Sequence, residues 1–177
     1  DNTSSYQYPA SYPGAISIAA LDRGLQKSSF SCYGDKIRYA FPGVDIFSTY
    51  IGGYDETDEF VITTDAYEFM SGTSMACPHV SGVAALGLSY AAKLRRHFKA
   101  DEFRDLLYET ATPIDQYMSG TKLYRKYVID LEESSPLMSF AMKRFTGGMG
   151  QGRIKAYDLL KAVENTGVDM TSPNVYA

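Results

Sequence analysis

Residues 70–92 restrict the fold more than any other part of the sequence, because this run contains no Asp, Glu, Lys or Arg. A run of this length raises the possibility of a membrane span. Pro78, His79, three glycines and several hydroxyl side chains within it make a span unfavourable. We therefore expect no membrane span, and instead a central helix over about residues 73–98 that is packed on all sides.

The composition is ordinary for one globular domain. The chain has 177 residues, 45% of them apolar and 21% charged, and a formal net charge of −4. This length and composition can bury a sizeable core, and the acidic balance argues against a nucleic-acid partner. The densest basic cluster, residues 93–99, is explained by the charged last turn of the central helix. Two cysteines, Cys32 and Cys77, are too few for a disulfide framework, although a single bridge between them is possible.

The chain opens on a polar stretch, DNTSSYQYP, with no apolar signal region. We therefore interpret it as a mature or truncated piece of a protein.

Strand-like runs precede the charge-free run. Residues 15–21 are almost continuously apolar and fit a strand that is buried on both faces, as in a parallel sheet. Residues 35–43 and 44–51 give two more strand-like runs, separated by a Pro-Gly pair. An acidic insertion follows, in which residues 60–64 and 66–70 are expected to pair as a two-stranded ribbon.

Helical patterns follow the charge-free run. Apolar residues recur every three or four positions in residues 101–111 and again in 154–165, which predicts two amphipathic helices. Residues 117–146 between them show no clear periodicity. The side chains expected to face inward are Phe103, Leu106, Leu107 and Thr110 in the first helix, and Ile154, Tyr157, Leu160 and Val163 in the second. Strands first and helices later favour an α/β fold, a sandwich with a sheet covered on both sides.

Ser74 is the candidate nucleophile, because it lies in the first turn of the central helix. Free backbone N–H groups point outward there and the helix dipole is positive, so an oxyanion formed at Ser74 would be stabilised. Gly72 would let a substrate backbone approach closely. A simple helix cap is the alternative for a Thr-Ser pair. Pro78 and His79 favour the catalytic interpretation, since a cap requires neither of them.

Residues 72–82, GTSMACPHVSG, resemble the nucleophile motif of the subtilisin-like serine peptidases (subtilases), Gly-Thr-Ser-Met-Ala-x-Pro-His-Val-x-Gly. Residues 8–50, 66–113 and 147–163 are also similar to segments of that family, in the same order. The resemblance implies a three-layer α/β sandwich with a mostly parallel sheet, present as a partial domain. Residues 1–177 would be the C-terminal part of the catalytic domain, with insertions at about 53–65 and 117–146.

The resemblance also implies roles for individual residues. Ser74 would be the acylating nucleophile of a serine endopeptidase that acts on peptides or proteins, and its own backbone N–H would form part of the oxyanion hole. His79 would orient the start of the helix rather than act as the base. By family habit the protein would be secreted or attached to the cell envelope. The supporting motif residues are Gly72, Thr73 and Met75, and Met70 and Ser71 would line the leaving-group side.

The other catalytic groups are expected upstream of residue 1, because the family order is Asp, His, Ser. The sequence contains two histidines, His79 and His97, and neither lies in a His-Gly-Thr-like context. The second oxyanion donor of the family, an asparagine, is also expected before residue 1, with Asn2 as a weaker candidate. We therefore expect the isolated chain to be inactive without a complementary N-terminal half, and to self-associate through its uncovered surfaces.

No metal site is expected in this chain. Arg38 stands near the position where the family places the acid of a weak cation site. The first insertion contains an acidic run of Asp55, Glu56, Asp58 and Glu59. We interpret this run as a solvated loop rather than a calcium site. Calcium remains possible in the full-length protein. The alternative function is a non-catalytic pseudo-peptidase or processed subunit that binds a partner, which the insertions and the missing base favour.

Overall fold

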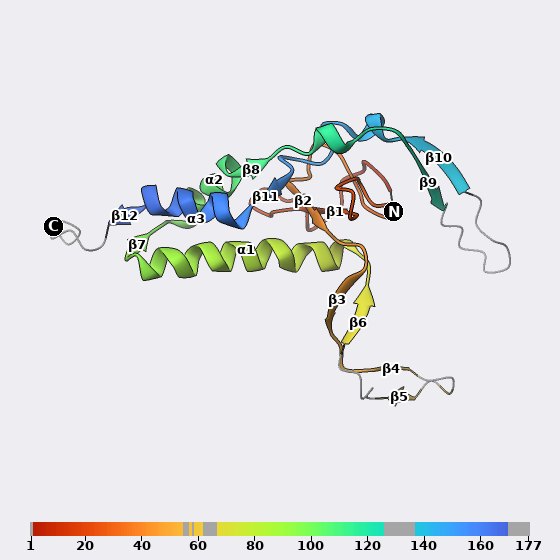
Figure 1. Cartoon of the computed structure of the whole chain (residues 1–177), viewed down its shortest axis with the longest axis horizontal. Helices are drawn as coiled ribbons and strands as arrows, with labels where there is room; N and C mark the ends of the chain where they lie inside the picture. The colour runs from red at the N-terminus through yellow and green to blue at the C-terminus, as the bar shows by residue number, and fades with distance from the viewer. Residues whose placement is uncertain (1, 55–56, 58, 62–66, 126–136, 170–177) are drawn as a thin grey trace.

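The computed structural model describes residues 2–54, 57, 59–61, 67–125 and 137–169 (Figure 1). At its centre, β1 (Ile18–Leu21) and β2 (Tyr39–Pro42) pair in parallel. Side chains alternate along both strands, and those on each face lie in a buried core. The prediction of a strand that is buried on both faces is therefore confirmed for β1.

One face of this pair packs against α1 (Thr73–Lys93), and two further helices extend the same side: α3 (Ala156–Asn165) lies against α1, and α2 (Ala100–Glu109) lies against α3. Figure 1 shows α1 running along the body, with α3 beside it. The two strands and the three helices share one apolar cluster, whose buried members are Ala20, Tyr39, Phe41, Ala76, Val80, Ala91, Phe103, Leu106, Leu107, Ile154, Leu159 and Val163.

The phase of α3 differs from the prediction. Leu159 and Val163 are buried, whereas Tyr157 is 68% exposed and Leu160 is half-buried. Leu159 packs close to Gly87 of α1, so this contact decides which side of α3 faces inward. In α2 the inward positions are as expected, except that Thr110 is the capping residue after the helix end and is only partly buried.

The central helix is shorter than expected and is buried on one side only. It ends at Lys93, and Arg96–His97 form β7, which pairs with β12 (Val168–Asp169). The prediction that residues 93–99 form a last helical turn is therefore wrong: Arg95 turns the chain at φ 53°.

The expectation that α1 is packed on all sides is also wrong. Among the described residues, α1 is covered only on the side toward β1, β2 and α3, where its own Ala76, Val80, Gly87 and Ala91 are buried. The other side is exposed and has no Asp, Glu, Lys or Arg before Lys93; this uncharged face includes Cys77, Pro78, Ser81, Gly82, Ala85, Leu86, Leu88, Ser89 and Ala92.

Two ribbons project from the body beside the start of α1 (Figure 1). In the first, β3 (Ile46–Thr49) pairs with β6 (Tyr67–Met70); in the second, β4 (Gly53–Tyr54) pairs with β5 (Phe60–Val61). The predicted pairing of residues 60–64 with 66–70 is therefore wrong where the structure describes it, since 60–61 and 67–70 pair with other strands; residues 62–64 and 66 lie outside the described residues. Gly52, at φ 144°, lies between β3 and β4.

The other face of β1 and β2 is covered by residues 114–125 and 137–149, here called the covering segment. It contains a hairpin of β9 (Thr121–Arg125) and β10 (Leu137–Ala141), with short 3₁₀ turns η1 (Asp115–Tyr117) and η2 (Met142–Phe145) before and after it. Its buried apolar side chains are Ile114, Met118, Tyr124, Met142, Phe145 and Met149.

A further short pair, β8 (Ala111–Thr112) with β11 (Arg153–Ile154), flanks the covering segment. Of the pairs in the described residues, only β1–β2 is parallel, so the expected mostly parallel sheet is not seen in this part of the chain. The described residues form an α/β fold.

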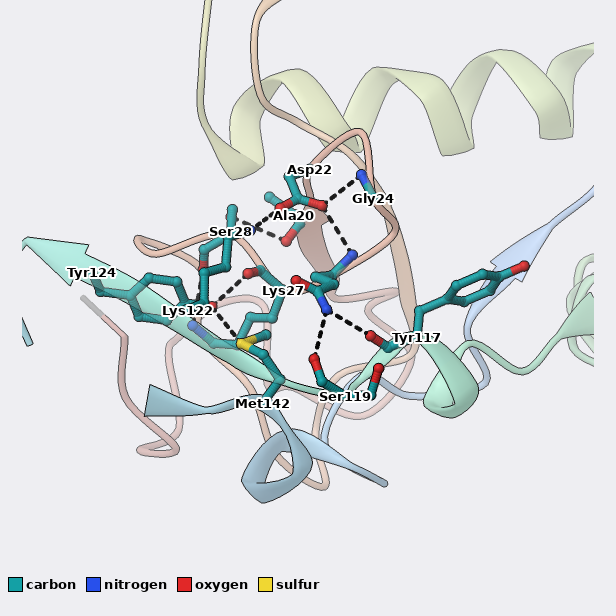
Figure 2. Close-up of polar contacts among 11 residues, drawn as sticks. Ala20, Asp22, Gly24, Lys27, Ser28, Tyr117, Ser119, Lys122, Tyr124 and Met142 are labelled. Carbon is teal, nitrogen blue, oxygen red and sulfur yellow. Dashed lines mark hydrogen bonds and ion pairs between the residues drawn. The ribbon is translucent and has the colours of Figure 1, made fainter. Parts of the chain in front are cut away.

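Polar contacts attach the covering segment to the loop after β1 (Figure 2). Gln26 donates to the carbonyl oxygens of Tyr117 and Ser119, both at 2.9 Å. Asp22 forms an ion pair with Lys122, and Figure 2 shows these two side chains on facing segments.

Lys27, on the same loop, is fully buried. Its Nζ lies 4.7–5.5 Å from the ring centroids of Tyr33, Tyr124 and Phe145, two of which belong to the covering segment. It donates to Asn2 Oδ1 at 2.6 Å and to the Ser28 carbonyl at 2.9 Å. Burial lowers the pKa of Lys27 to about 8, because the rings and two neutral acceptors replace only part of its hydration.

The end of β2 touches the start of α1. Gly72 N–H donates to Gly43 O at 2.7 Å. A Cβ added to Gly43 would lie 2.6 Å from Gly72 O and 2.8 Å from the Cβ of Ala20, so glycine is required for this approach.

Replacing Gly43 by alanine tests this contact. Gly43→Ala should lower the free energy of unfolding by about 1–3 kcal/mol, because the atoms it meets are backbone or first side-chain atoms and cannot rotate away. Gly82→Ala on α1 is the matched control: its Cβ meets nothing within 4 Å, and it should raise stability by about 0.5–1 kcal/mol. Urea unfolding followed by circular dichroism measures both, and equal effects would contradict the contact.

The burial of Lys27 predicts a stability that rises with pH. Its folded-state pKa of about 8 lies below the ordinary 10.5, so between these values the unfolded chain binds more protons and folding becomes more favourable as pH increases. Lys27→Met should remove this rise and gain about 1–3 kcal/mol at pH 7. Urea titrations from pH 7 to 10.5 measure it. The exposed Lys143→Met is the control and should keep the rise; a rise that survives Lys27→Met would refute its origin.

Candidate active site

Ser74 is the second residue of α1, and its side chain is exposed. The helix is capped by Gly72 without a side-chain hydrogen bond, and the first helical bonds run from Met75 N–H and Ala76 N–H to Gly72 O, at 3.1 and 3.3 Å. Thr73 and Ser74 are thus helical residues rather than caps, which removes the simple-cap interpretation. Within the described residues, neither the Oγ nor the N–H of Ser74 has a hydrogen-bond partner.

Two bonds hold the turn that leads into Ser74. One is the Gly72–Gly43 bond described above. In the other, Ser71 Oγ accepts the N–H of Asp45 at 2.9 Å. Ser71 and Asp45 are functional-site residues that sequence reasoning missed in this positioning role, because a bond between residues 26 positions apart leaves no local pattern.

Ser74 opens onto an uncharged hollow of about 480 Å³ between the start of α1 and the β1 side of the body. Besides Ser74, its lining includes Ala10, Ile16, Ile18 and Cys77. A second hollow, of about 420 Å³, lies on the ribbon side of the same turn and includes Met70, Met75 and His79. Ser74 therefore stands between two open spaces, and groups from outside the described residues have room to reach it.

His79 is exposed, and its Nδ1 lies 2.8 Å from the Met75 carbonyl oxygen, in position to donate. The preceding Pro78 has no N–H, so the backbone cannot bond the Ser74 carbonyl in the usual way. A ring bonded to the helix start agrees with the expected orienting role of His79, which stays a prediction. His97 lies in β7, at the opposite end of α1 (Figure 1), about 30 Å along a helix of this length.

Asn2 does not line the hollow beside Ser74. Its Oδ1 is held by Lys27, and its backbone N–H donates to Phe30 O. The structure thus does not bring Asn2 to Ser74, and its expected role as oxyanion donor gains no support.

The cysteines do not form the possible bridge: Cys32 and Cys77 are both free thiols.

Arg38, which stands near the expected cation position, is held by its backbone: its N–H donates to Ser17 O, and its carbonyl oxygen accepts the N–H of Gln151.

Of the acidic run, Asp55, Glu56 and Asp58 lie outside the described residues. In the part of the chain that is described, no group of three or more His, Cys, Asp or Glu side chains could hold a metal ion. Among the same residues, no helix has the length and apolar character needed to cross a membrane.

Comparison with known proteins places this geometry in context. A family model described as the subtilase family matches residues 1–145. Thermitase from Thermoactinomyces vulgaris is 40% identical over 117 residues, covering 66% of this chain and 34% of that protein. Subtilisin E from Bacillus subtilis is 37% identical over 136 residues, covering 76% of this chain and 30% of the relative. A thermostable alkaline protease from Halalkalibacterium halodurans is 38% identical over 117 residues, covering 66% and 27%.

Solved structures agree with the fold. The prenylagaramide maturation protease PagA is 26% identical, with a TM-score of 0.59 that covers 94% of this chain and 48% of that protein. A protease of Pseudoalteromonas arctica gives the same score at 22% identity, covering 88% and 38%. The chain spans less than half the length of each of these relatives. The family match over residues 1–145, the relatives and the geometry around Ser74 agree, and the chain belongs to the subtilase family.

Proposed function

We propose that the chain supplies the nucleophile of a serine endopeptidase, and that Ser74 is that nucleophile. The observation that carries the proposal is the state of Ser74: its Oγ is exposed beside an uncharged hollow, and its own N–H, at the positive end of α1, is unpaired among the described residues. The family membership, and relatives that are named as proteases, support a peptidase.

In this mechanism Ser74 Oγ attacks the carbonyl carbon of a substrate peptide bond while an imidazole takes its proton. The oxyanion that forms accepts the N–H of Ser74. The imidazole then returns the proton to the leaving amine, and the acyl group stays on Oγ until water, deprotonated by the same imidazole, releases it.

The imidazole is expected to come from another part of the domain. His79 is bonded to Met75 O and His97 lies at the far end of α1, so neither is in position to activate Ser74. We infer that a complementary N-terminal half carries the histidine, the aspartate that orients it and the second oxyanion donor. The domain would then be the three-layer sandwich, with residues 1–177 as its C-terminal part and insertions at about 53–65 and 117–146.

Two surfaces are suited to that half. The uncharged face of α1 is exposed. In the described residues β1 has no strand partner besides β2, but the loop after it bonds the backbone of Ala20 on the other edge through Ser28 and Ser31, so a parallel sheet could continue only from the first part of the strand. The hollow between them contains Ser74. Without the complementary half, the same surfaces favour self-association.

The protein is proposed to act outside the cytoplasm, because one of its relatives is a halolysin-like extracellular serine protease of Natrialba magadii. A binding scaffold without catalysis is the second candidate, favoured by the absence of a base beside Ser74 in the described residues. Calcium is proposed only for the full-length protein.

Labelling with a fluorophosphonate tests both candidates. For the isolated chain, both the rate of labelling and the rate of hydrolysis of a fluorogenic peptide should equal the background rates. Addition of a complementary N-terminal half should produce both labelling and peptide hydrolysis, because a base then activates Ser74 Oγ. Ser74→Ala should abolish them, by about 10⁶-fold in turnover, the loss measured for the triad serine of subtilisin.

Ser139→Ala is the matched control, since Ser139 is an exposed serine on β10 of the covering segment, and it should leave both the labelling and the peptide hydrolysis unchanged. A reconstituted protein that folds yet remains unlabelled would favour the scaffold. Labelling that persists in Ser74→Ala would assign the nucleophile to another residue.

A further inference from the structure

Residues 93–99 form a basic surface that the fold leaves without its expected role. Four of these seven residues are Lys or Arg and none is Asp or Glu, although the net charge of the chain is −4. A charged last helical turn would explain them through the helix dipole. The helix instead ends at Lys93, and the chain turns at Arg95 and continues into β7. Most of this charge therefore needs another explanation.

Arg96 is the basic residue of this stretch that stabilises the fold. Its side chain is partly buried, and its Nη1 donates to the carbonyl oxygens of Thr166 and Gly167 at 3.2 and 3.4 Å, directly after the end of α3. These carbonyls lie at the negative end of the α3 dipole, which favours a cation. Arg96 therefore has an internal role and is set apart from its basic neighbours.

The other basic side chains of the stretch are exposed and stand at every second position. This basic row consists of Lys93, Arg95, His97 and Lys99. None of the four forms an ion pair with a carboxylate in the part of the chain that the structure describes. The acids at the start of α2 accept backbone N–H groups instead, Glu102 from Lys99 and Asp101 from Glu102. The row therefore presents unpaired positive charge to solvent.

The backbone sets the spacing of the row. Phe98 is partly buried and packs edge-on against Phe103, so His97 and Lys99 on either side of it lie on the outer surface. Lys99 has an extended backbone, at φ −71° and ψ 160°. Alternate side chains of an extended chain recur about every 7 Å. Carboxylates at alternate positions of an extended polypeptide have the same repeat, so they match the spacing of the row.

Other polyanions fit the row less well. Single-stranded nucleic acids gain affinity from bases that stack on exposed aromatic side chains, whereas the ring within the row, Phe98, packs inward. Proteins that bind a duplex make about six to ten phosphate contacts, more than four side chains supply. Membrane binding is strengthened by large apolar side chains that insert beside basic ones, whereas the apolar side chain opposite His97 is one valine, Val168. An acidic polypeptide segment is the occupant that the row favours.

We propose that the basic row binds an acidic, extended segment of a partner polypeptide, whose alternate Asp or Glu side chains face Arg95, His97 and Lys99. The row lies at the end of α1 opposite Ser74, beside β7 and β12 (Figure 1), about 30 Å along the helix. It is therefore a separate interaction site, and the proposal does not depend on the proposed peptidase function.

Peptide binding tests the proposal. A rhodamine-labelled ten-residue peptide of alternating Glu and Ser, and the same peptide with Gln in place of Glu, are titrated with the chain at low salt, and anisotropy gives Kd. The Glu peptide should bind saturably and roughly tenfold more tightly than the Gln peptide. Added salt should weaken its binding, because the charges meet at the surface.

Charge reversal locates the site. Arg95→Glu and Lys99→Glu should each raise the Kd of the Glu peptide by about fivefold, because each replaces an attraction with a repulsion. Both side chains are exposed, and an acid at position 99 suits the positive end of α2, so both variants should fold. Lys143→Glu is the matched control: it changes the net charge equally on η2, in the covering segment, and should leave Kd unchanged. Thermal unfolding checks that each variant is folded.

The proposal is overturned by equal Kd values for the two peptides, by the absence of saturable binding, or by unchanged binding in the folded Arg95→Glu and Lys99→Glu variants. An equal loss in Lys143→Glu would attribute the binding to net charge alone. Oligothymidylate or phosphatidylglycerol vesicles that bind more tightly than the Glu peptide, and that lose binding in the same two variants, would assign the row to a nucleic acid or a membrane.

Sedimentation that shows a dimer dissolved by Arg95→Glu and Lys99→Glu would overturn the proposal in favour of a second copy of the chain. Fluorophosphonate labelling of Ser74 does not depend on the basic row, and peptide binding to the row does not depend on acylation. Failure of this proposal and failure of the proposed function are therefore distinguishable.

Discussion

The contact between Gly43 and Gly72 is the constraint on which the site depends. It brings the end of a buried strand against the first turn of a helix, at a distance that no side chain larger than hydrogen permits. The bond from Gly72 N–H to Gly43 O fixes where α1 begins, and the buried alanines at 20 and 76 fix its direction. Because Ser74 lies two residues later, its exposure and its unpaired N–H follow from this packing.

Local chemistry could be predicted from the sequence, and contacts between distant segments could not. The start of α1 and the burial of β1 follow from glycine, helix termini and apolar runs, all of which act over a few residues. The pairing of β6 with β3, and the side of α3 on which Tyr157 lies, depend on partners eighteen or more positions away. The same holds within the site: the motif predicted Ser74, whereas the bond between Ser71 and Asp45 has no sequence signature.

The covering segment buries one face of β1 and β2, and the cluster that includes α1 buries the other. Tyr124 of the segment's hairpin and Phe145 of η2 supply two of the three rings around Lys27, and Lys122 forms an ion pair with Asp22, so the loop after β1 is held by polar as well as apolar contacts. The uncharged face of α1 has no such cover among the described residues. One side of the body is therefore complete, and the side that contains Ser74 is open.

Pro78 has a mechanical consequence for the first turn of α1. A proline nitrogen cannot bond the carbonyl four residues earlier, which here belongs to Ser74, so one of the bonds that would normally tie this turn to the next is missing. Bonds from outside the helix hold the same turn: Gly72 N–H donates to Gly43 O, and Ser71 Oγ accepts the N–H of Asp45. The position of Ser74 is thus anchored to β2 and to the ribbon as well as to the helix that follows it.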